Sequence, residues 1–275
     1  MLRATQEYHN FRIPVTAEFE EVFSHFYFAE NNTDAPLSKT LLPNFQTLLV
    51  FGFGPKITLQ SKLNTTLVLD KCVVLGPVKQ AFTYTLPVNA QMLVANFKDD
   101  AFYRFFGKAI TDGHVPFNPD ELLAENCFTN LWHELQKIAG INEKVDFILA
   151  FCKPYLRHRE GAFKPLSNFD NQNHSLNPIK AIAKETNQSE RNVQLNHKKF
   201  LGYSAKEINR YHRFLKATEL IQQSLLLAKK LDWFEVIHAC NYYDQSQLIH
   251  DFKHFINLSP KQYLNFQQDI CDSKV

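Results

Sequence analysis

The C-terminal third of the chain contains almost none of the residues that interrupt helices. Beyond Pro178 there is a single glycine, Gly202, and a single proline, Pro260. Glycine and proline are the least favourable residues inside a helix, and no alternating β pattern is present in this region. Pro260 directly follows Ser259, where the first position of a helix tolerates proline. We therefore predict that the chain is helical throughout this part.

The preceding part of the chain has a different pattern. Between about residues 39 and 106, short β-branched or aromatic runs alternate with turn residues, as in TLLVFGFGP, TLVLD, CVVLGP and FTYTLP. This pattern predicts antiparallel strands in a small barrel or sandwich. Between residues 120 and 156, Leu131, Leu135 and Ile138 recur at a helical period, which predicts two helices.

Length and pattern together predict two domains of the α+β class. A chain of 275 residues exceeds the usual size of one domain. We assign residues 1–156 to a β-rich domain with terminal helices and residues 157–174, rich in Asn, Ser and charged residues, to a linker. Residues 175–265 then form an all-α domain.

The charge of the chain is small but unevenly distributed. Residues 1–174 hold 16 Lys and Arg against 18 Asp and Glu, a net charge of −2. Residues 175–275 hold 14 against 10, a net charge of +4, and five of the 11 histidines. This uneven distribution of charge is compatible with a C-terminal domain that binds nucleic acid, although it does not establish one.

The cysteines and the hydropathy pattern indicate a reducing compartment. The cysteines are scattered, with no CxxC pair and no spacing that would close around zinc. The N-terminus lacks a signal-peptide core, and no stretch approaches 18 apolar residues. We therefore expect a cytoplasmic protein that makes no membrane contact. The five cysteines are Cys72, Cys127, Cys152, Cys240 and Cys271.

Two short helices separated by a polar turn are predicted within residues 179–200. The first carries Ile179 and Ile182 on one face, and Ser189 is positioned to cap the second. An inward stripe of the second helix is formed by Val193, His197, Phe200 and Leu201. The opposite face carries Arg191, Gln194, Leu195 and Lys198.

The same design recurs after a helix of about twenty residues, long enough to span roughly 30 Å. A helix at about residues 233–240 turns into another at 244–255, whose inward stripe is Leu248, Phe252 and Phe255. Ser259 and Gln262 then offer a capping box for a last helix. Outward positions of the 244–255 helix are Ser246, Gln247, His250 and Lys253.

Both segments resemble the paired helix-turn-helix domain of AraC/XylS-type transcription regulators. The similarity covers about residues 175–265. The stretch YYDQSQLIHDFKHFINLSPKQYL resembles the family signature of the second unit, and SERNVQLNHKKFLGYSAKE matches the weaker pattern of the first. Members of this family insert one recognition helix of each unit into adjacent major grooves of double-stranded DNA.

The resemblance implies base-reading roles for the outward side chains. Glutamine can pair with adenine through two hydrogen bonds, and arginine can contact guanine or a phosphate. The predicted DNA-contacting residues are Ser189, Arg191, Gln194, Leu195 and Lys198 in the first unit and Gln245, Ser246, Gln247, His250 and Lys253 in the second.

Some positions depart from the family pattern. Leu195 and His250 stand where arginine is common, which predicts fewer guanine contacts and a site that favours A·T pairs or is weaker. His197 replaces an aromatic core residue, and we interpret it as a buried, hydrogen-bonded histidine. Asn241 and Asn257 replace glycines, a mild change because asparagine tolerates left-handed backbone.

The β-rich half resembles, more loosely, the sensing domains of such regulators. This similarity implies that residues 1–156 bind a small-molecule effector, mediate homodimerisation, or do both. We expect no enzymatic activity and no cofactor.

Three alternatives remain for the chain. One is a non-catalytic protein-interaction module built on a degenerate helix-turn-helix domain. A second is a metal-dependent cupin-like enzyme, against which the chain lacks a His-x-His pair and His9, His25, His114 and His133 are isolated. The third is an alkyl-transfer repair regulator, for which Cys72 or Cys127 would have to be an activated thiolate.

Overall fold

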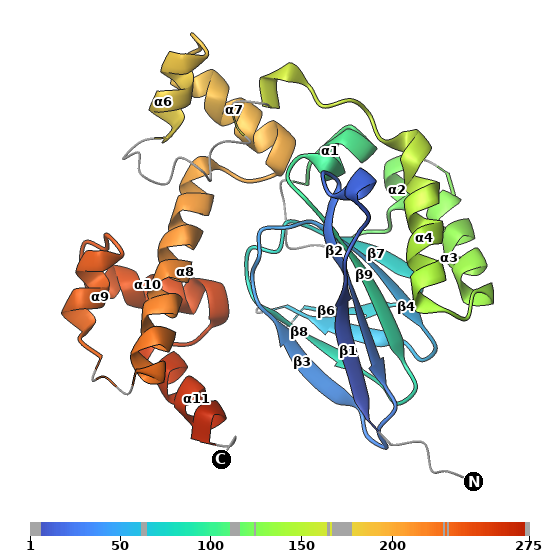
Figure 1. Cartoon of the computed structure of the whole chain (residues 1–275), viewed down its shortest axis with the longest axis horizontal. Coiled ribbons are helices and arrows are strands. Elements are labelled where there is room, and N and C mark those ends of the chain that lie inside the picture. The colour runs from blue at the N-terminus through green and yellow to red at the C-terminus, as the bar shows by residue number, and fades with distance from the viewer. Residues whose placement is uncertain are drawn as a thin grey trace. The chain divides into compact units, whose positions relative to one another are not determined.

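The computed structural model describes residues 7–61, 65–110, 116–123, 125–163, 166, 178–227, 229 and 231–272. The chain divides into two compact units, Met1–Ser204 and Ala205–Val275. In the described residues, the first unit holds the strands and several helices, whereas the second is helical (Figure 1). This combination confirms the α+β class.

The strands of the first unit form two antiparallel sheets. A five-stranded sheet has the order β1-β2-β9-β4-β7, and a four-stranded sheet has the order β3-β8-β5-β6. The strands are β1 Tyr8–Ile13, β2 Phe23–Asn31, β3 Leu37–Leu41, β4 Leu48–Phe53, β5 Ile57–Gln60, β6 Thr66–Leu69, β7 Cys72–Leu75, β8 Phe82–Leu86 and β9 Gln91–Phe97.

Alternation along the strands gives the five-stranded sheet two different faces. On β2, Tyr27 and Ala29 pack with residues of the opposite sheet such as Tyr84. Phe26 and Phe28, which point the other way, join a second, phenylalanine-rich core. The first unit is therefore a sandwich whose larger sheet is buried on both faces.

Helices that follow β9 cover the outer face of the larger sheet (Figure 1). Phe102, Phe128 and Ile148 bring three of these helices into the phenylalanine-rich core. The helical elements are α1 Ala101–Phe106, α2 Asp120–Leu123, α3 Cys127–Lys137 and α4 Ile141–Cys152, followed by the 3-10 turns η2 Lys153–Tyr155 and η3 Gly161–Phe163.

The strand predictions from residue 39 onward are confirmed at β4, β6, β7 and β8. Three expectations need correction. Strands β1 and β2 precede the predicted β region, residues 101–106 form α1 instead of a strand, and residues 120–156 hold three α-helices rather than two. The reason is clear for α1, because its six residues, AFYRFF, are too few for their period to distinguish a helix from a strand.

The C-terminal helices agree closely with the predicted ones. They are α6 Pro178–Glu185, α7 Glu190–Leu201, α8 Ala205–Leu226, α9 Trp233–Ala239, α10 Gln245–Ile256 and α11 Pro260–Asp272. Helices α6 and α7 belong to the first compact unit, and α8 to α11 belong to the second.

The predicted linker is partly structured. Phe163 is buried within η3, at 1% exposure, and Leu166 is buried as well. Residues 157–163 and 166 of the predicted linker are described, whereas residues 164–165 and 167–174 lie outside the described residues. The boundaries 1–156, 157–174 and 175–265 stay a prediction, because the compact units divide after Ser204.

Candidate nucleic-acid interface

Helices α6 and α7 form the first helix-turn-helix. Ile179 and Ile182 are buried, as their spacing predicts. The turn holds Asn187 at a φ of 52°, a left-handed conformation that asparagine adopts more readily than most residues. Ser189 caps α7, because its Oγ accepts a hydrogen bond of 3.2 Å from the backbone N–H of Asn192. Local chemistry therefore determines both the turn and the start of α7.

The outward face of α7 is open to solvent. Arg191, Gln194 and Lys198 are exposed, and Leu195 is 58% exposed. Four of the five residues predicted for the first unit therefore present free side-chain surface on one helix face. The fifth, Ser189, is exposed but uses its hydroxyl oxygen as the helix cap.

The inward face of α7 contains a buried histidine. His197 is 1% exposed, and its Nδ1 lies 2.8 Å from the carbonyl oxygen of Tyr203. Val193 and Phe200 are buried on the same stripe. A buried imidazole needs a hydrogen-bond partner, and this one has it. The interpretation of His197 as a hydrogen-bonded core residue is confirmed.

The C-terminal end of α7 is attached to the β-rich part of its unit. Tyr103 of α1 donates a 2.7 Å hydrogen bond to Glu160 Oε1, and Lys199 Nζ donates one of 2.9 Å to Glu160 Oε2. The Phe200 ring meets Tyr103 at 4.9 Å and Phe163 at 5.7 Å, both edge to face. We call these five residues the α7 anchor. Sequence analysis missed it, because its members are far apart in the chain.

The Glu160 bridge predicts a pH-dependent contribution to the α7 anchor. Hydrogen bonds from Tyr103 and then Lys199 lower the pKa of Glu160. A lowered pKa in the folded state means that the stabilisation is present above the ordinary glutamate pKa and is lost as the pH falls through the folded value. We expect Glu160→Gln to reduce amide-exchange protection in α7 at about pH 7, and this difference to be smaller at about pH 3, below the ordinary glutamate pKa. An equal difference at both pH values would contradict the bridge.

Helices α9 and α10 form the second helix-turn-helix. Asp232 caps α9 by accepting from the N–H of Phe234, and Asp244 caps α10 by accepting from the N–H of Gln247. Asn241, in the turn, has a φ of 57°. Asparagine therefore fills the left-handed position that the resemblance assigns to glycine, as predicted, and Asn257 at 60° does the same after α10.

The two faces of α10 match the predicted pattern. Leu248, Phe252 and Phe255 are buried. Four of the five predicted DNA-contacting residues are exposed, and Gln247 is half-buried. The exposed four are Gln245, Ser246, His250 and Lys253.

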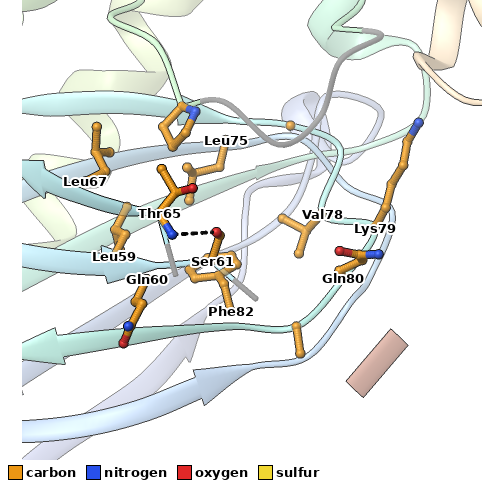
Figure 2. Close-up of a pocket in the computed structure, with 13 residues that line it drawn as sticks. Leu59, Gln60, Ser61, Thr65, Leu67, Leu75, Val78, Lys79, Gln80 and Phe82 are labelled. Atoms are coloured by element: carbon orange, nitrogen blue, oxygen red, sulfur yellow. Dashed lines mark hydrogen bonds between the residues drawn. The ribbon is translucent and has the colours of Figure 1, made fainter. Parts of the chain in front are cut away.

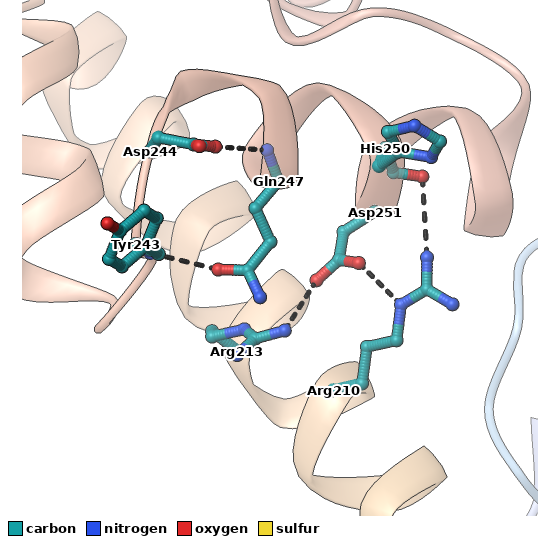
Figure 3. Close-up of polar contacts among 7 residues, drawn as sticks. All are labelled: Arg210, Arg213, Tyr243, Asp244, Gln247, His250 and Asp251. Carbon is teal, nitrogen blue, oxygen red and sulfur yellow. Dashed lines mark hydrogen bonds and ion pairs between the residues drawn. The ribbon is translucent and has the colours of Figure 1, made fainter.

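Gln247 has a structural role that sequence analysis did not predict. Its side-chain Oε1 accepts a hydrogen bond of 2.9 Å from the backbone N–H of Tyr243. The backbone N–H of Gln247 in turn donates a hydrogen bond of 2.8 Å to Asp244 Oδ1 (Figure 3). This reciprocal pair satisfies two N–H groups at the start of α10. The side-chain oxygen of Gln247 already accepts this hydrogen bond, and the DNA contact of Gln247 stays a prediction.

A buried carboxylate fixes α10 against α8. The Asp251 side chain is 2% exposed and pairs with Arg210 Nε at 2.5 Å and Arg213 Nη2 at 3.2 Å (Figure 3). The two guanidinium groups also lie over the Phe255 and Tyr242 rings, at 5.5 Å and 4.8 Å. Asp251 therefore determines how α10 is seated, on the side opposite its exposed face.

The start of α11 confirms the second predicted capping box. Ser259 N–H donates to Gln262 Oε1 at 2.7 Å, and Gln262 N–H donates to Ser259 Oγ at 3.2 Å. Pro260 occupies the first position of the helix.

Two adjoining cavities lie in the sandwich of the first unit. The larger, about 240 Å³, has Arg12, His25 and Tyr27 among its lining residues. The smaller, about 80 Å³, is shown in Figure 2, where Leu75 and Val78 point inward and Lys79 points away. Leu59, Leu75 and Phe82 line both cavities.

Cys72 and Cys127 lack the features of a reactive thiol. Burial, and then the charge of Asp120, raise the pKa of Cys72 to about 12 and also raise the pKa of Cys127. A thiol with a raised pKa is protonated near neutral pH and is a poor nucleophile. This environment disfavours the alkyl-transfer alternative.

Two findings concern metals and membranes. Among the described residues, no group of three or more His, Cys, Asp or Glu is placed to hold a metal ion. Within the same residues, no helix is long and apolar enough to cross a bilayer. His114 lies outside the described residues.

The fold and the two helical pairs define a chain in which a β-rich domain precedes two helix-turn-helix units. Residues 12–115 match a domain of unknown function (DUF6597), and no curated protein matches the chain.

The solved structures to which this chain is similar share little sequence with it. ToxT from Vibrio cholerae is 14% identical with a TM-score of 0.42, over 85% of this chain and 99% of that one. The AraC-like transcriptional activator CuxR is 9% identical with a TM-score of 0.28, over 76% and 86%. An RmlC-like cupin protein from Desulfovibrio desulfuricans is 13% identical with a TM-score of 0.26, over 35% and 92%.

Proposed function

We propose that this protein is a sequence-specific DNA-binding transcription regulator of the AraC/XylS type. Helices α7 and α10 would each read a major groove of double-stranded DNA, and the grooves would be adjacent. The β-rich domain would control occupancy at a promoter by responding to a small-molecule effector or partner. The protein would act in the cytoplasm as a homodimer, without a catalytic step.

One observation carries this proposal. In both helix-turn-helix units, the second helix buries a stripe of apolar or histidine side chains and exposes a row of mainly polar ones. A single helix with a polar face is ordinarily just a solvated surface. Two such helices, each preceded by a short helix and a turn that asparagine permits, match the DNA-reading design.

The exposed residues favour particular contacts. Gln194 on α7 and Gln245 on α10 can each pair with adenine through two hydrogen bonds. Arg191 and Lys198 flank Gln194 on α7 and can reach guanine or a phosphate. Leu195, which is 58% exposed, can press against a thymine methyl. These contacts support a site rich in A·T pairs.

Selection of bound sequences from a random DNA pool tests this proposal. We expect a motif of ~20 base pairs with two half-sites about one helical turn apart. Gln194→Ala is expected to relax the preference at one half-site and to weaken binding by roughly 10- to 100-fold. Gln223→Ala is the matched control, because Gln223 is an exposed glutamine on α8, outside both predicted recognition helices. An unenriched pool would contradict sequence-specific binding.

The main alternative is a protein-interaction module. Phe234 and Tyr243 of the second unit are 81% and 92% exposed, which is unusual for aromatic side chains. A salt titration separates the two functions. About six phosphate contacts give a log–log slope of affinity against salt near −5, whereas a protein partner gives a much smaller dependence.

A further inference from the structure

The cavity of about 240 Å³ beside Arg12 combines a cation, neutral hydrogen-bonding groups and apolar walls. Strand pairing places the polar side chains on one sheet face, because Arg12 pairs with Tyr27 on β2 and His25 pairs with Asn96 on β9. Farther along the same face, Leu48 and Leu75 provide apolar surface. One end of the cavity is thus polar, and the rest is hydrocarbon.

The charge of this cavity is positive. Arg12 is its permanently charged residue, and no Asp or Glu is among the described residues that line it. Arg12 also forms no ion pair with any described residue. A guanidinium group offers parallel N–H donors that match the geometry of a carboxylate.

The remaining polar groups are neutral at ordinary pH. Burial, and then the nearby charge of Arg12, lower the pKa of His25. Burial is also the main reason that the pKa of Tyr27 is raised to about 12. The hydroxyls of Tyr27 and Tyr84 lie 3.5 Å apart, and both are close to that of Tyr8. These phenols can therefore donate or accept hydrogen bonds without adding charge.

We propose that this cavity binds a small monocarboxylate with an apolar body, its carboxylate at Arg12 and His25 and its hydrocarbon between Leu48, Leu75 and Phe82. The inference rests on the proposed function, since it assigns a chemical class to the effector. All of the lining residues fall between residues 12 and 96, so the site lies within the part of the chain that matches DUF6597.

The cavity size limits the ligand. Sites for drug-sized molecules usually occupy about 300–1,000 Å³, so a volume of about 240 Å³ suits one ring or a short chain. The smaller cavity adjoins it at three shared side chains, those of Leu59, Leu75 and Phe82.

Calorimetric titration of the full chain with matched probes tests the charge requirement. The probes are 3-phenylpropanoate, its neutral amide 3-phenylpropanamide and the cationic 3-phenylpropylamine, with octanoate as a chain-shaped acid. We expect at least one acid to bind roughly 10- to 100-fold more tightly than the amide, since hydrogen bonds to charged groups are worth about that factor. Equal binding of acid and amide, or no binding by either acid, would overturn the proposal.

Variants at Arg12 locate the carboxylate. Arg12→Met is expected to weaken acid binding by roughly 10- to 100-fold and to leave amide binding unchanged, whereas Arg12→Lys retains part of the affinity. Lys153→Met, which removes an exposed cation paired with Glu18 outside the cavity, is the control for net charge. Acid binding that survives Arg12→Met would also overturn the assignment.

The same titration distinguishes this inference from the proposed function. It is performed without DNA, so ligand binding can be confirmed even if DNA selection fails. Conversely, an enriched DNA motif with no acid binding would leave the regulator assignment standing and remove the ligand class.

Discussion

Replacing Asp251 with asparagine is expected to destabilise the second unit by about 3 kcal/mol. The substitution keeps the shape of the side chain but removes the charge that Arg210 and Arg213 share. Breaking a buried ion pair costs about 3–5 kcal/mol, because the remaining charge is left without its partner. The lower value applies here, since the two arginine side chains are 33% and 26% exposed and keep some water.

Amide hydrogen exchange of α10 measures this loss directly. Protection of buried positions such as Leu248 and Phe252 is expected to fall by roughly 100-fold in Asp251→Asn. Glu219→Gln is the matched control, because Glu219 is an exposed carboxylate on α8. Unchanged protection in Asp251→Asn would show that the triad contributes nothing to the seating of α10.

Replacing Phe200 with alanine is expected to cost about 3–5 kcal/mol in the stability of α7 within its unit. Phe200 is 2% exposed and packs against Tyr103 and Phe163 of the α7 anchor. Alanine leaves a cavity there, and it removes the ring over which Lys199 Nζ lies at 4.7 Å. Urea unfolding and exchange protection of α7 measure the effect.

Leu195 on the same helix provides the matched comparison. Leu195→Ala is expected to change stability by no more than about 0.5 kcal/mol, because the side chain is 58% exposed. It should nevertheless weaken binding at the first half-site if the leucine meets a thymine methyl. Equal effects of Phe200→Ala and Leu195→Ala on stability would contradict the assignment of the two faces of α7.

Much of the candidate interface could be predicted from the sequence, because the helical period separates inward from outward positions. The exposed row on α7 and most of the row on α10 lie where the pattern placed them. Gln247 is the exception. Periodicity placed it outward, but its side chain turns back to cap α10 and is half-buried. Competition between a cap and a DNA contact is invisible to a pattern that records only polarity.

The same limit applies to Asp251. Its position on α10 places it beside Leu248 and Phe252 on the inward stripe, where a carboxylate is unfavourable without a partner. The partners are on α8, 41 and 38 residues away in sequence. Several arginines and lysines of the chain could have paired with the Asp251 carboxylate. Only the packing of α8 against α10 selects two of them, Arg210 and Arg213.

The sequence by itself determined the features that depend on neighbours within one helical turn. These are the helical segments themselves, the caps at Ser189, Asp244 and Ser259, and the left-handed turns at Asn187, Asn241 and Asn257. Each is a hydrogen bond or a backbone preference that a residue satisfies with groups a few positions away.

Only the tertiary structure decided which distant side chains meet. The α7 anchor, the Asp251 triad and the cavity beside Arg12 all join residues separated by dozens of positions. Their energies depend on burial and on distances of a few ångströms, which the relative placement of strands and helices sets. No local pattern contains that placement, because the same stripe of apolar residues can pack against many different partners.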